Sequence, residues 1–115
     1  MLERNKLPRR SSLKRQADID RLLKAGNRIS GDYFSLVWQK SDDFSYGVLV
    51  SKKYGSATKR NRLKRHIREA VRLNRHCLKD TVSLAVLPRL NVGEPDFDFV
   101  NAEIIRIFKL INDRA

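Results

Sequence analysis

Residues 50–70 read VSKKYGSATKRNRLKRHIREA and connect an aliphatic strand to a strongly basic helix. The aliphatic run that ends near Val50 is typical of a strand, and Gly55 and Ser56 mark a turn after it. From there to about Leu78 the apolar residues recur at helical spacing, and the Ser56 hydroxyl is predicted to cap the helix. This transition from strand to helix is the centre of the predicted fold.

The segments before this transition predict one helix and up to three strands. Apolar residues recur at helical spacing over 16–25, and Gly26 follows, where the C-terminus of a helix favours a left-handed residue. Alternation over 33–38 and an aliphatic run over 44–51 predict two strands. We expect these two strands to pair as a hairpin, with a further short strand at 28–30.

The segments after the basic helix predict one strand and one helix. Residues 81–87 are typical of a buried strand that stops at Pro88, and Asp96 is placed to cap a final helix. One face of that helix carries Phe97, Val100, Ile104, Phe108 and Ile111. The predicted fold is therefore α+β, an α/β sandwich with the element order αβββαβα.

Length and composition limit the classes of protein to which the chain can belong. Its 115 residues suffice for one modest core, and we expect a single domain over residues 13–115 behind a basic arm at residues 1–12. The aliphatic runs are too short to cross a membrane, and the charged N-terminus does not resemble a signal peptide. The single cysteine, Cys77, excludes an internal disulfide, is expected to be buried, and favours a cytoplasmic location.

Positive charge is concentrated in two places. The chain has 25 Lys and Arg against 13 Asp and Glu, and residues 52–75 hold ten of these bases against Glu69 alone, a net charge of +9. Residues 1–15 carry a net charge of +5, and the rest of the chain is slightly acidic. On a helical wheel a wall of basic residues lies along one edge of the apolar stripe, which suits a phosphate backbone. This wall of bases comprises Arg60, Lys64, Arg65, Arg68, Arg72 and Arg75.

The same basic segment resembles the signature of the bacterial ribonuclease P protein subunit. The resemblance rests on residues 50–57 and 59–70, with Arg60-Asn61-Arg62 at their centre, and extends over nearly the whole chain, including Leu13-Lys14-Arg15, Lys24-x-Gly26 and Leu87-Pro88-Arg89. In that family an RNA subunit performs the hydrolysis that removes the 5′ leader from precursor tRNA, and the protein binds both RNAs. The resemblance implies the protein component of an endonuclease, with no catalytic side chains in this chain. It also implies a left-handed βαβ crossover, as in the second domain of a ribosomal small-subunit protein.

The resemblance implies two sets of site residues. The first set would bind the RNA subunit near the tRNA cleavage site. Together with neighbouring basic residues of the same cluster, this set comprises Lys52, Lys53, Lys59, Arg60, Asn61, Arg62, Lys64, Arg65, Arg68 and Arg72. For Asn61, hydrogen bonding to RNA or to a metal-bound water and a local bond within the helix both remain open. The second set would line a cleft for the leader between the first helix and the sheet, and comprises Ile19, Leu23, Tyr33, Ser35 and Val37.

The expected partners are therefore the ribonuclease P RNA and the 5′ leader of precursor tRNA, with no membrane and no obligatory protein partner. We expect no metal site and no tightly bound cofactor on the protein, and Mg²⁺ to serve the holoenzyme through its RNA. A structural RNA-binding protein of the ribosome is the alternative, because it would share the charge and the small size. A standalone nuclease is disfavoured because the sequence has no acidic cluster.

Overall fold

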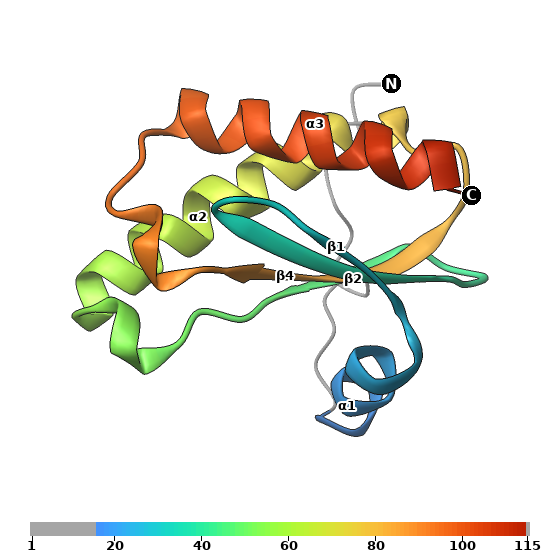
Figure 1. Cartoon of the computed structure of the whole chain (residues 1–115), viewed down its shortest axis with the longest axis horizontal. Coiled ribbons are helices and arrows are strands. Elements are labelled where there is room, and N and C mark those ends of the chain that lie inside the picture. The colour runs from blue at the N-terminus through green and yellow to red at the C-terminus, as the bar shows by residue number, and fades with distance from the viewer. Residues whose placement is uncertain (1–15, 115) are drawn as a thin grey trace.

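The computed structural model describes residues 16–114, so the predicted arm at residues 1–12 lies outside it. Three helices and four strands follow one another in the predicted order αβββαβα, and Figure 1 shows their arrangement. The elements are α1 (Gln16–Ala25), β1 (Asn27–Ser30), β2 (Phe34–Lys40), β3 (Ser45–Val48), α2 (Ala57–Asn74), β4 (Val82–Pro88) and α3 (Phe97–Arg114). Short 3₁₀ turns occupy Lys52–Tyr54, Arg75–Cys77 and Leu90–Val92. None of the helices in this part of the chain is long and apolar enough to cross a membrane.

The four strands form one mixed sheet in the order β1-β2-β4-β3. The predicted hairpin between residues 33–38 and 44–51 is wrong, because β4 lies between β2 and β3. The hairpin is instead formed by β1 and β2, which pair Ser30 with Ser35, and β2 then pairs antiparallel with β4. β3 is an edge strand that runs parallel to β4, with Tyr46 opposite Leu84. Local alternation predicted the strands, but it carries no information on the long-range partner that separates two of them.

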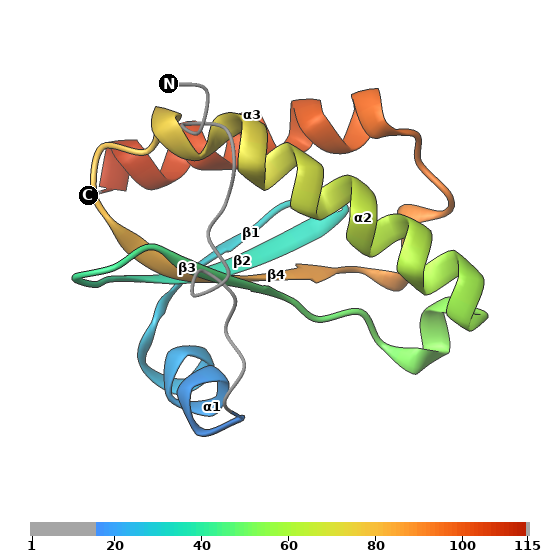
Figure 2. The ribbon, with the colours of Figure 1, turned by 180° about the vertical axis from the view of Figure 1, so that it is seen from behind.

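The connection from β3 through α2 to β4 is a left-handed crossover. Figure 2 shows both parallel strands running the same way, with α2 returning above the sheet between them. Such units are right-handed in about 98% of proteins, so the hand is a distinguishing feature of this fold. It agrees with the hand that the family resemblance implies.

The sheet separates two layers of unequal size. α2 and α3 cover one face and α1 lies against the other (Figure 1). On the larger side Phe34, Leu36 and Trp38 alternate along β2 into a core with residues of β4, α2 and α3, and each is at most 3% exposed. On the smaller side Leu22 of α1 packs on Val37 of β2 and on a β4 alanine. α2 is therefore anchored by the main core, and α1 by a smaller cluster.

Local signals at the helix ends are partly confirmed. The Ser56 hydroxyl accepts a hydrogen bond from the amide of Lys59 at 3.2 Å, and Asp96 accepts one from Phe99 at 2.9 Å. Gly26 does not have the left-handed backbone that we expected. A Cβ there would lie 2.7 Å from both the Leu22 carbonyl oxygen and a Val37 methyl carbon, so close packing of α1 on β2 explains the glycine.

Cys77 is exposed, and the expectation that it is buried is wrong. The α-helix ends at Asn74, and the following residues form a 3₁₀ turn, so a wheel with 100° per residue no longer places them correctly.

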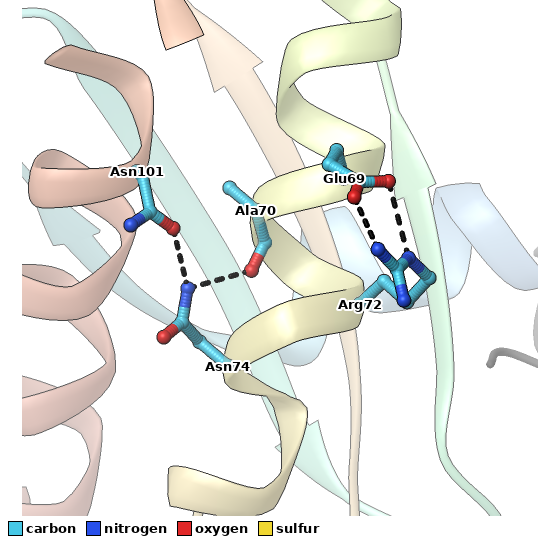
Figure 3. Close-up of polar contacts among 5 residues, drawn as sticks. All are labelled: Glu69, Ala70, Arg72, Asn74 and Asn101. Atoms are coloured by element: carbon cyan, nitrogen blue, oxygen red, sulfur yellow. Dashed lines mark hydrogen bonds and ion pairs between the residues drawn. The ribbon is translucent and has the colours of Figure 1, made fainter. Parts of the chain in front are cut away.

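Asn74 connects the two helices of the larger layer at the end of α2. The residue is 8% exposed, and its side-chain amide donates to the Ala70 carbonyl at 2.8 Å and to the Asn101 side-chain oxygen of α3 at 2.7 Å (Figure 3). A buried amide with both donors satisfied fixes the register of α2 against α3.

We expect Asn74→Ala to lower the free energy of unfolding by about 1–3 kcal/mol, because it removes both bonds and leaves the Asn101 oxygen without this donor. Urea unfolding followed by circular dichroism measures this loss. Asn101→Ala is the matched control: combined with Asn74→Ala it should cost less than the sum of the two single losses. Strictly additive losses would show that the two amides do not stabilise each other.

Candidate nucleic-acid interface

The basic side of α2 faces away from the core. Leu63, Ile67, Ala70 and Val71 are at most 2% exposed and pack on the sheet and on α3. Their positions turn the wall of bases outward, as the helical wheel predicted. Among the predicted RNA-binding residues, Lys52, Lys53, Lys59, Asn61, Arg62, Arg65 and Arg68 are exposed, and Arg60, Lys64 and Arg72 are half-buried. The structure thus brings the whole predicted set onto one helix and the turn before it.

The turn that enters α2 is held by short-range hydrogen bonds. The Ser51 hydroxyl accepts from the amide of Lys53 at 3.1 Å, which orders the 3₁₀ turn that carries Lys52 and Lys53. Arg60 reaches back and donates to the Gly55 carbonyl at 2.6 Å. Arg60 is therefore partly committed to the fold, whereas the amide of Asn61 is exposed on the helix.

Glu94 is an acidic neighbour of this surface that the sequence analysis missed. It comes from the loop before α3, and its carboxylate lies 3.3 Å from Lys59 Nζ and 3.7 Å from Arg62 Nη1. Tyr54 fixes the same loop by donating its hydroxyl hydrogen to the Gly93 carbonyl. Burial and the nearby Glu94 charge both raise the pKa of Tyr54, so it stays a donor at neutral pH. No pattern in the sequence connects residue 94 with α2, because the contact depends on how the loop packs.

Glu69, the one acid within α2, pairs with Arg72 (Figure 3). Arg72 Nε donates to one carboxylate oxygen at 3.1 Å, and Nη2 donates to the other. This hydrogen bonding lowers the pKa of Glu69. Arg72 thus shares its guanidinium with a carboxylate.

The middle of α2 differs from both ends in its charge balance. Within residues 16–114, no carboxylate lies within ion-pair distance of Lys64, Arg65 or Arg68. Arg68 lies close enough to Tyr46 of β3 for its charge to offset part of the rise that burial causes in the pKa of Tyr46. These three basic residues lie between the pairs made by Glu94 and Glu69, and no carboxylate of the described chain pairs with them.

The predicted leader cleft is assembled only in part. Leu23 of α1 is half-buried and packs on the cluster that contains Val37, but Val37 is 1% exposed and lies beneath α1. Ser35 and Ile19 are also buried, at 8% and 9% exposed. The prediction that Tyr33 lies on this face is wrong. It precedes β2, so the alternation of the strand does not extend to it.

Tyr33 packs instead on the side of the larger core, with its ring 5.2 Å from that of Phe99 in α3. The half-buried surface beside α1 is completed by Leu49 and Leu87, which the sequence analysis did not select. Leu49 continues β3, and its amide donates to the Val86 carbonyl, so register alone could have placed it beside residue 87.

Comparison with known proteins identifies the family. The sequence model of the family described as ribonuclease P matches residues 7–112. The chain belongs to this ribonuclease P protein family. It is 32% identical over 109 residues to the ribonuclease P protein component of Thermotoga maritima, covering 90% of this chain and 93% of that protein. It is 33% identical over 106 residues to that of Dictyoglomus turgidum, covering 89% of each.

Solved structures agree with this assignment. The ribonuclease P protein from Thermotoga maritima superposes with a TM-score of 0.78 at 30% identity, covering 86% of this chain and 96% of that one. The ribonuclease P protein of Staphylococcus aureus superposes with a TM-score of 0.80 at 25% identity, covering 88% and 94%. The family assignment makes the chain a component of an endoribonuclease that processes tRNA, and makes the ribonuclease P RNA its partner.

We expect the Glu69 carboxyl to titrate below the ordinary glutamate pKa, and Arg72→Gln to move its midpoint back toward that value. The pair stabilises the fold fully above the unfolded-state pKa of about 4.3 and loses this contribution as the pH falls through the lowered folded-state pKa. The carboxylate is 45% exposed, so the gain at neutral pH should be about 0.5 kcal/mol or less. Carbon-13 NMR titration of the side chain measures the midpoint, and an ordinary midpoint in the wild type would contradict the pairing.

Proposed function

We propose that this chain is the protein subunit that binds the catalytic RNA of ribonuclease P and the 5′ leader of precursor tRNA. The observation that carries the proposal is the outward wall of bases on α2, centred on Lys64, Arg65 and Arg68. Its three central residues lack carboxylate partners within the part of the chain that the structure describes. Guanidinium groups fork onto phosphate oxygens and stack on exposed bases, which suits a folded RNA.

The leader would lie on the other side of the sheet, beside α1. The proposed contacts are the half-buried Leu23, Leu49 and Leu87, which extend toward the start of α2, together with the small exposed parts of Ile19 and Ser35. Stacking on an aromatic ring contributes about 1–3 kcal/mol per base, so an aliphatic surface should hold each base less tightly. Val37 would act indirectly, by supporting α1 from below.

Hydrolysis of the phosphodiester bond is assigned to the RNA subunit in this proposal. Mg²⁺ would serve the reaction through sites on that RNA, and the protein would add no catalytic side chain. Its own contribution is to neutralise phosphates and to hold the leader near the cleavage site, which raises the affinity for the precursor tRNA.

Reconstitution tests the function directly. Purified protein is mixed with a bacterial ribonuclease P RNA and a precursor tRNA at low Mg²⁺, where neutralisation of phosphates should matter most, and leader release is followed on a gel. We expect faster cleavage at the mature 5′ end than with the RNA alone, and none with the protein alone. Unchanged cleavage would contradict the proposal, and RNA-independent cleavage would indicate a nuclease. Co-purification with ribosomal RNA would favour the ribosomal alternative.

Replacing Arg65 or Arg68 with Ala should weaken binding to the ribonuclease P RNA and reduce its salt dependence. Each lost phosphate contact should flatten the plot of log K against log salt by about 0.7–0.9. Filter binding at several salt concentrations measures the slope. Arg106→Ala on α3 is the matched control, because Arg106 already pairs with Glu103 at 2.9 Å. An unchanged slope for both α2 variants would show that their side chains do not contact phosphates.

A further inference from the structure

We infer a second RNA contact at the end of α2, where Arg75 lies over the ring of Phe44 and can stack against one unpaired base. Arg75 lies outside the segment of residues 50–70 that carries the resemblance, and Phe44 comes from the loop before β3. The inference rests on the proposed function, because it extends the RNA-binding surface along α2 to a stacking site.

The ring of Phe44 is a fixed platform. It stacks on the ring of Tyr46 with their centroids 6.1 Å apart and their planes at 26°. Tyr46 is 8% exposed within the main core, and Phe44 is half-buried against the same cluster. Both rings belong to the edge of the sheet, since β3 has only one neighbouring strand. One side of the Phe44 side chain is therefore packed in the protein, and part of it remains open beside α2.

Arg75 covers this open part. Its guanidinium carbon lies 5.1 Å from the centroid of the Phe44 ring. Over residues 16–114, no carboxylate lies within ion-pair distance of its side chain, in contrast to Arg72 and its partner Glu69. A guanidinium that rests on a ring keeps its charge and its outer face, and it loses less freedom on binding than a free side chain would.

The position of Arg75 continues the wall of bases. It follows Arg68 by seven residues and is the first residue of the 3₁₀ turn after α2. The edge of the sheet links the two arginines in space, because Arg68 lies near Tyr46, whose ring stacks on the Phe44 ring that Arg75 covers. An RNA strand that runs along Lys64 and Arg68 would reach Arg75 next.

The chemistry of the site selects an unpaired base. RNA bases that are not paired stack on Arg planes and on aromatic rings, whereas the bases of a duplex are covered by their neighbours. An Arg between a ring and a base gives both stacking and charge, and a Lys in its place would keep only the charge. This difference provides the test.

Binding of the full-length protein to the ribonuclease P RNA is measured for wild type, Arg75→Lys and Phe44→Leu at several salt concentrations. We expect each variant to bind about 5-fold or more weakly, because stacking is lost. The salt slope should stay as in the wild type, since neither variant changes the charge. The double variant should bind no more weakly than the weaker single one, because both remove the same stack. Arg106→Lys, from α3, is the control and should bind as the wild type does.

The outcomes separate this inference from the proposed function. A wild type that fails to bind the RNA overturns the proposed function and the inference with it. A wild type that binds, with an equally tight Arg75→Lys variant, overturns only the stacking site. Weak binding by Arg75→Lys with unchanged binding by a folded Phe44→Leu variant also overturns it, because the ring is then not involved. Thermal unfolding checks each fold, and if Phe44→Leu does not fold, Arg75→Lys alone decides.

Discussion

The packing of α2 on the sheet is the constraint on which the basic surface depends. Ile67, Ala70 and Val71 are fully buried, and Leu63 is 2% exposed, so the helix has one stable rotation about its axis. A turn of 100° would bring guanidinium groups into the core, and burial of each uncompensated charge costs several kcal/mol. The packing of the core therefore keeps a set of positive charges side by side on the outer surface of α2, although these charges repel one another. Their arrangement is maintained by hydrophobic burial, and attraction to RNA is not needed to form it.

Two acidic residues make the attraction of this surface for phosphate differ along α2. A phosphate that approaches Arg62 must compete with Glu94, and one that approaches Arg72 must compete with Glu69. A phosphate that approaches Arg65, in the middle of the helix, meets no competing carboxylate from residues 16–114. It displaces only water and ions. The two acids also order the ends of the surface, because each holds a long side chain in one place. The structure thus combines two ordered ion-paired segments with a stretch between them whose basic residues have no carboxylate partner within residues 16–114.

Local patterns predicted the elements well, and the pairing of the strands poorly. The bounds of α1 and the cap at Ser56 follow from spacing and side-chain chemistry within a few residues. The insertion of β4 between β2 and β3 depends on contacts between residues 38 to 54 positions apart, which no local pattern encodes. Tyr33 was misplaced for a related reason, because a period of two applies only inside a strand. Glu94 was missed since a loop residue reaches α2 only after α3 has packed.

The smaller layer suggests how the two proposed RNA surfaces are connected. α1 packs so closely on Val37 that only a glycine fits at position 26, between the helix and the strand. The helix therefore covers this end of the sheet face. The half-buried surface that remains runs from Leu23 to Leu49, and three residues after Leu49 the chain reaches Lys52 at the entry to α2. An apolar strip thus ends where the basic surface begins. The short connection from β3 to α2 would place the leader and the catalytic RNA on adjoining parts of one small domain.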